Sequence, residues 1–151
     1  MENLFNIIKQ HGKFYTLLNN RYKVESESFD IQENNQIMTI KSQLVLDSSK
    51  LNSFVKLLVK VLSFSTIKLD ITVIIYKNLN KITYILQTNN YEDSFKTQGS
   101  ILFDNDNNIL LHDNQLQTES NILKMKQFNK MIKNRMEEDI SLIFSNLIKL
   151  K

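Results

Sequence analysis

The sequence predicts an α+β fold: a curved antiparallel sheet of about six strands packed on one long C-terminal helix, with an extra N-terminal helix. Three observations predict it. Apolar and polar residues alternate in several short runs between residues 27 and 116, which is typical of half-buried strands. Asparagine-rich segments separate these runs. From about residue 118 to 150 the apolar spacing changes to that of an amphipathic helix.

The first half of the chain divides into four elements. Residues 2–18 have near-helical apolar spacing interrupted by Gly12, and predict a helix within an N-terminal extension of residues 1–24. Residues 27–33 and 36–46 alternate, and predict two strands joined by a hairpin at Asn34-Asn35. Residues 49–64 return to the helical period and predict an amphipathic helix. We expect one domain over residues 1–151, with the sheet and its helices in residues 27–150.

The second half predicts four sequential strands over 66–76, 82–87, 95–103 and 109–116, followed by the long helix. Short polar turns between them indicate an antiparallel meander in which each strand has one apolar face. The chain has two Gly and no Pro, so we expect Asn to occupy the turn positions that need a left-handed backbone. Thr118 or Ser120 is the expected N-cap of the last helix.

This order of elements is similar to the helix-grip layout of the START and Bet v 1-like proteins. The resemblance is one of topology only, with one strand fewer than usual and no sequence motif of that superfamily. It implies an apolar cavity between sheet and helix that holds lipids, pigments or polyketide-like ligands, in roles that are often not enzymatic. The apolar residues expected to line such a cavity are Ile71, Val73, Tyr84, Ile101, Met125, Ile132 and Met136.

The composition indicates the source more than the activity. The chain has no Ala, Cys or Trp and only two Arg, against 19 Asn and 17 Lys. No folding rule excludes Ala, which is the best helix former, so drift in a very AT-rich genome explains the bias better. We therefore expect an organelle-encoded protein, with a plastid favoured over a mitochondrion. Without Cys there is no disulfide and no thiolate metal site.

Histidine provides no clear catalytic or metal site. His11 and His112 are far apart in sequence, and neither has a second His nearby. Asp113 follows His112, but adjacent side chains of a strand point to opposite faces, so a surface or edge role is favoured for His112. An enzyme would need His112 in a pocket with its imidazole facing a carboxylate.

Acidic residues are also assigned to ordinary roles. The segment Asp104-x-Asp106-x-Asn108 matches the start of a calcium loop, but the later Gly and Glu of that loop are missing, so a hairpin turn is expected. Consecutive residues fan out around a helix, so Glu137, Glu138 and Asp139 cannot all converge. They are expected to form a solvated ion-pair face with Lys133.

We therefore expect a non-catalytic, soluble or peripheral protein that needs no cofactor or metal. It would bind an apolar ligand or assist a larger complex, photosynthetic or membrane-bound. No apolar run approaches the length of a membrane span, and the first residues do not resemble a secretory signal. The alternative is an RNA- or ribosome-associated protein, suggested by the net charge of +3. It is also suggested by basic and aromatic residues near the N-terminus: Lys9, Lys13, Phe14, Tyr15, Arg21, Tyr22 and Lys23.

Overall fold

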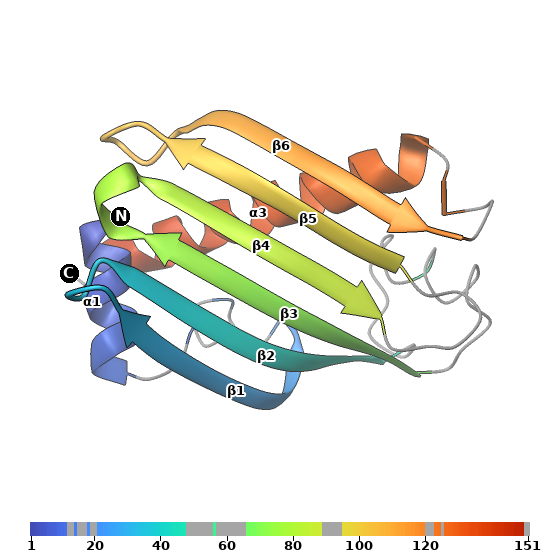
Figure 1. Ribbon diagram of the computed structural model, residues 1–151, viewed down its shortest axis with the longest axis horizontal. Helices are drawn as coiled ribbons and strands as arrows, with labels where there is room; N and C mark the ends of the chain where they lie inside the picture. The colour runs from blue at the N-terminus through green and yellow to red at the C-terminus, as the bar shows by residue number, and fades with distance from the viewer. Residues whose placement is uncertain are drawn as a thin grey trace.

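The α+β layout is confirmed by a computed structural model, which describes residues 1–11, 14, 18, 21–47, 56, 66–88, 95–119, 123–124 and 126–149. Its elements are α1 (Glu2–His11), β1 (Lys23–Gln32), β2 (Ile37–Asp47), β3 (Thr66–Tyr76), η3 (Lys77–Leu79), β4 (Lys81–Thr88), β5 (Phe95–Phe103), β6 (Ile109–Thr118) and α3 (Lys126–Lys149). Helix α3 runs along one face of the sheet, and α1 lies at the end where both termini are found (Figure 1). Apart from Lys56, the helix expected over 49–64 lies outside the described residues.

The sheet is an open antiparallel meander with strand order β1-β2-β3-β4-β5-β6. Asparagine holds most of the described turn positions with a left-handed backbone, and the exception is Glu33, with φ of 48° in the β1–β2 turn. Asn34 and Asn35 have φ of 54° and 66° in the β1–β2 turn, Asn80 has 45° before β4, and Asn107 has 64° before β6. Asn tolerates this region better than other residues with a Cβ, so the strands can pair closely without glycine.

The core lies between α3 and the central strands. In β3 and β4 alternate side chains are buried on one face of the sheet: Ile67, Leu69, Ile71, Val73, Ile75, Ile82, Tyr84 and Leu86. A helix is roughly 10–12 Å wide. Neighbouring strands lie about 4.8 Å apart, so one helix covers only two or three of them. The central strands therefore have the clearest apolar faces.

The expectation that every strand has an apolar face is wrong for β1. None of its residues is buried, and Phe29 is 37% exposed. In β6 only His112 is buried. Both are edge strands, and of the two only β6 contacts α3 in the described part of the chain, through pairs such as His112 with Glu137. The charged residues Glu25, Glu27 and Asp30 of β1 are of the kind that keeps an open edge from pairing with other chains.

The expected N-terminal extension is part of the core instead. Helix α1 ends at His11 rather than continuing to residue 18, and β1 begins at Lys23, inside the segment assigned to the extension. Leu4, Phe5 and Ile8 of α1 are almost fully buried. These side chains supply apolar cover that a single helix across the sheet cannot provide.

The C-terminal helix begins later than expected. Thr118 is the last residue of β6, and α3 begins at Lys126, so Thr118 is not its N-cap. Ser120 lies outside the described residues. From its start α3 runs unbroken to Lys149. None of the described helices is both long and apolar enough to cross a membrane.

Candidate apolar binding site

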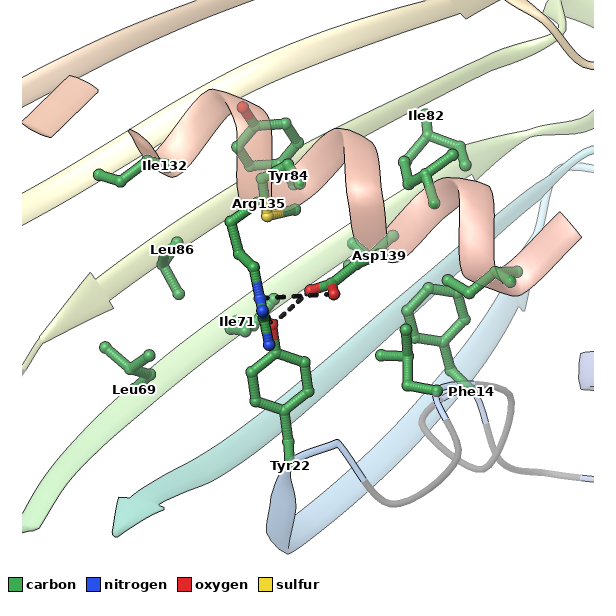
Figure 2. Close-up of a pocket in the computed structure, with 15 residues that line it drawn as sticks. Phe14, Tyr22, Leu69, Ile71, Ile82, Tyr84, Leu86, Ile132, Arg135 and Asp139 are labelled. Atoms are coloured by element: carbon green, nitrogen blue, oxygen red, sulfur yellow. Dashed lines mark hydrogen bonds and ion pairs between the residues drawn. The ribbon is translucent and has the colours of Figure 1, made fainter. Parts of the chain in front are cut away.

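A small cavity lies between the sheet and α3. Its volume is about 50 Å³. The lining comes from β3, β4, α3 and the segment before β1: Phe14, Leu18, Tyr22, Leu69, Ile71, Val73, Ile82, Tyr84, Leu86, Ile132, Arg135, Met136, Asp139, Ile140 and Ile143. Figure 2 shows apolar side chains on both sides of one polar group, formed by Tyr22, Arg135 and Asp139.

Most residues expected to line a cavity do so. Ile71, Val73, Tyr84, Ile132 and Met136 are all part of the lining. Ile101 is buried in the core but is absent from the lining, and Met125 lies outside the described residues. A strand's apolar face can be identified from its alternation, but the part of that face that borders empty space depends on how the helix packs over it.

The cavity is too small for the ligands of typical binding pockets. A water molecule needs roughly 10–15 Å³ of such space, so about 50 Å³ holds a few waters or a small apolar group. Pockets for drug-sized ligands run to roughly 300–1,000 Å³. A whole lipid or pigment does not fit without movement of the walls.

The polar group in the cavity wall is a relay of hydrogen bonds. Arg135 Nε donates to the Tyr22 hydroxyl at 2.8 Å, and that hydroxyl donates to Asp139 Oδ2 (Figure 2). The Arg135 guanidinium also lies over the Tyr22 ring, 5.3 Å from its centre. Arg135 and Asp139 are buried, with 9% and 7% of their surface exposed.

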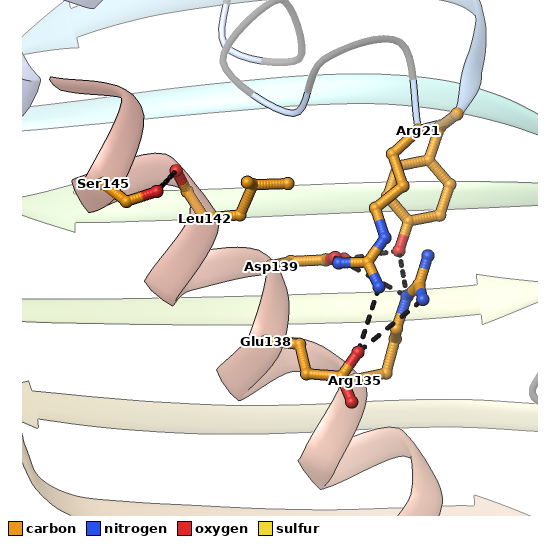
Figure 3. A network of polar contacts seen from close by, with 7 residues as sticks. Arg21, Arg135, Glu138, Asp139, Leu142 and Ser145 are labelled. Atoms are coloured by element: carbon orange, nitrogen blue, oxygen red, sulfur yellow. Dashed lines mark hydrogen bonds and ion pairs between the residues drawn. The ribbon is translucent and has the colours of Figure 1, made fainter. Parts of the chain in front are cut away.

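Arg21 extends the relay toward solvent. Its Nη1 donates to Asp139 Oδ1 at 2.7 Å, and its Nη2 donates to Glu138 Oε2 at 3.0 Å (Figure 3). Two arginines and two carboxylates therefore share one cluster, whose charges cancel. Arg21 and Arg135 are the only arginines in the chain. Arginine forms planar, directional bonds that lysine cannot, which explains its use here in a chain otherwise rich in lysine.

Burial shifts the pKa values of two groups in this cluster. It raises the pKa of Asp139 above the ordinary value, against the opposing effects of the Tyr22 hydrogen bond and the two arginines. Burial likewise raises the pKa of the Tyr22 hydroxyl, and the nearby Asp139 adds to that rise. Tyr22 is therefore neutral at pH 7 and keeps the proton that it donates to Asp139.

The acidic run on α3 is solvated only in part, because Asp139 is buried while 61% of the Glu138 side chain and 37% of the Glu137 side chain are exposed. Its three residues point in different directions, and Glu138 and Asp139 share Arg21 as a partner. Glu137 contacts His112, Glu138 contacts Arg21, and Asp139 is buried against Arg21 and Tyr22. The prediction considered only Lys133 on the same helix. The partners observed are Arg21, Tyr22 and His112, which lie in other parts of the chain.

A second polar network joins α3 to β4, β5 and β6. His112 Nδ1 lies 2.7 Å from Glu137 Oε1, and its Nε2 lies 2.9 Å from the Tyr84 hydroxyl. That hydroxyl also donates to Asn114 Oδ1 at 3.0 Å. The carboxylate facing the imidazole is therefore Glu137 rather than the neighbouring Asp113.

His112 has the orientation of a catalytic base without the access. Its side chain is only 2% exposed, and it is absent from the lining of the cavity. The Tyr84 ring lines the cavity, but its hydroxyl is engaged by His112 and Asn114. We expect this network to hold the edge strand β6 onto α3, since a reacting group could not reach the imidazole.

Acidification should destabilise the protein partly through His112. Burial lowers the pKa of His112, although Glu137 opposes that effect. The unfolded chain thus binds a proton near pH 6.5, while the folded chain binds it only at lower pH. The stability contributed by neutral His112 is fully present above the unfolded pKa and is lost as the pH falls from there through the lower folded pKa.

The measurement is urea unfolding at about pH 7.5 and about pH 5.5, followed by circular dichroism. The wild type should lose more unfolding free energy between these two values than His112→Gln. Both proteins retain His11 and every carboxylate, so the difference reports His112. Equal losses would show that His112 does not titrate differently in the folded and unfolded states.

No protein-family model, curated protein or solved structure matches this chain. The helix-grip resemblance therefore remains one of layout.

Proposed function

We propose that this protein is a non-catalytic binding protein, and that the cavity between β3, β4 and α3 receives a small apolar ligand or the apolar part of a larger one. The observation that carries the proposal is a cavity walled by aliphatic and aromatic side chains, with a single polar cluster at one place. Apolar space with a few convergent polar groups is the usual form of a binding site.

The size of the cavity limits the ligand. About 50 Å³ suits a short aliphatic segment or a similarly small group. The N-terminal segment contributes Phe14 and Leu18 to the wall, and Phe14 N donates to Glu27 Oε1 at 2.7 Å, which ties this segment to β1. Longer ligands would require this wall to move.

Titration with hexan-1-ol tests the proposal. In protein labelled with ¹³C at the isoleucine methyl groups, we expect saturable shifts at Ile71, Ile82 and Ile132, which line the cavity. Ile74 is the internal control. It lies three positions after Ile71 on β3, so its side chain points to the opposite face of the sheet, away from α3.

A matched pair of variants sharpens the test. Ile71→Phe should fill the cavity and abolish the shifts at Ile82 and Ile132, whereas Ile74→Phe on the other face should leave them unchanged. Overpacking costs roughly 1–3 kcal/mol, so circular dichroism must first show that Ile71→Phe is folded. Absence of shifts in the wild type, or equal shifts in both variants, would refute the proposed site.

The RNA-associated alternative has no comparable support. Among its N-terminal residues, Phe14 is buried, while Arg21 and Tyr22 are bound to Asp139, so these three are not presented for stacking or phosphate contact. The organellar setting is likewise a proposal. It is supported by the codon-driven composition, with a plastid favoured for the same reason.

A further inference from the structure

We infer that the ligand of this cavity carries a carboxylate, which binds the two Nη groups of Arg135 while a short apolar tail occupies the cavity. The inference rests on the proposed function and names the chemical class of its ligand. It follows from the incomplete pairing of one buried arginine.

Arg135 has unused hydrogen-bonding capacity. Its guanidinium carries five N–H bonds, yet among the described residues only Nε makes a hydrogen bond, and the acceptor is the neutral hydroxyl of Tyr22. Its ion-pair distances are long: 3.5 Å from Nε to Asp139 Oδ1 and 3.8 Å from Nη1 to Glu138 Oε2. Neither Nη group has a hydrogen-bond acceptor within the described part of the chain.

The nearby carboxylates are occupied by other donors. Asp139 accepts from Arg21 through Oδ1 and from Tyr22 through Oδ2, and Glu138 accepts from Arg21. Arg21 therefore takes the short, direct contacts and leaves Arg135 with the distant ones. A charged side chain that is only 10% exposed is rarely left in this state, because burial without good partners is costly.

The position of Arg135 determines what could complete its pairing. It lines the cavity together with Ile71 and Ile132, and its guanidinium ends beside Ile71 and above the Tyr22 ring (Figure 2). The two Nη groups form a planar fork that matches the two oxygens of a carboxylate. The surrounding wall is apolar. A ligand with one anionic end and a short aliphatic tail would therefore place its anionic end on Arg135 and its tail against the apolar wall.

Three six-carbon probes test the inference: hexanoate, hexan-1-ol and hexylammonium. Affinity is measured from the isoleucine methyl shifts of Ile71 and Ile132. Hexanoate should bind the wild type at least tenfold more tightly than hexan-1-ol, and hexylammonium should bind most weakly. Arg135→Met, which keeps the length and removes the charge, should weaken hexanoate at least tenfold and change hexan-1-ol less than threefold.

Lys130→Met is the matched control, because it removes one positive charge from an exposed position on the same helix. It should leave hexanoate affinity unchanged. If Arg135→Met fails to fold, Arg135→Lys keeps the charge without the planar fork and should still weaken hexanoate several-fold. If hexan-1-ol binds but hexanoate shows no Arg135-dependent preference, the inference fails and the proposed function stands. If neither probe binds, both fail.

Discussion

Replacing Gly99 with alanine is expected to lower the unfolding free energy by about 3 kcal/mol, because overpacking and the loss of buried hydrogen bonds both contribute. Gly99 lies directly opposite Tyr84 in the β4–β5 pair. A Cβ at residue 99 would lie 2.4 Å from the Tyr84 hydroxyl and 2.7 Å from the Asp113 carbonyl oxygen. The ring crosses over Gly99 to reach β6, so any side chain there displaces the hydroxyl from His112 and Asn114.

A double-mutant cycle checks the cause. In a Tyr84→Ala background the cost of Gly99→Ala should fall by more than half, because the ring that it strikes is gone. Ser100→Ala, one residue along β5 on the other face, should change stability by less than about 0.5 kcal/mol. An equal cost of Gly99→Ala with and without the Tyr84 ring would show that the close approach is unimportant. Urea unfolding measures the stability of all five proteins: the wild type, the two single variants of the cycle, the double variant and Ser100→Ala.

Replacing Asp139 with alanine should cost about 3–5 kcal/mol, the usual loss when one member of a buried ion pair is removed. The substitution removes the carboxylate oxygen to which the Tyr22 hydroxyl donates and the shortest ionic contact of Arg21. It also leaves the buried Arg135 with only a distant carboxylate.

The neighbouring Glu138→Ala is a close control. Glu138 also accepts a hydrogen bond from Arg21, but its side chain is 61% exposed. Exposed ion pairs contribute less than about 1 kcal/mol, so this variant should be nearly as stable as the wild type. Two adjacent carboxylates bonded to the same arginine would thus differ several-fold in cost. Similar losses for the two variants would contradict the burial of Asp139.

Local pattern was enough to predict most of the sheet. The alternation in β3 identifies the buried set that contains Ile71 and Val73, and all of its members face α3. Asparagine marks turns at Asn35, Asn80 and Asn107, where φ is positive. These predictions succeed because side-chain direction and turn geometry depend on residues a few positions apart.

Boundaries and edges were less predictable. Helix α1 ends at His11, and α3 begins at Lys126 rather than near Thr118. Strand β1 has alternating residues such as Phe29 and Ile31 but no buried face, because it lies beyond the reach of α3. Whether an apolar position is covered depends on the width of the layer above it, which the strand's own sequence does not contain.

The polar clusters could not be derived from spacing. Arg21 and Asp139 are separated by 118 positions, and His112 and Glu137 by 25. One signal was nevertheless present: the chain has only two arginines, and both belong to the cluster at the cavity. Where composition disfavours a residue type, its rare occurrences are worth examining as sites.

The sequence by itself determined the fold class, most of the turn positions and the apolar faces from which the cavity walls are drawn, since each follows from short-range periodicity, whereas the pairing of β2 with β3 came from the tertiary structure. Only the tertiary structure decided that the cavity is small, that Ile101 lies outside it and that Arg135 is left partly unpaired at its wall. The physical reason is that volume and hydrogen-bond pairing depend on how distant segments pack together. A substitution such as Gly99→Ala is therefore costly because of the Tyr84 ring on another strand.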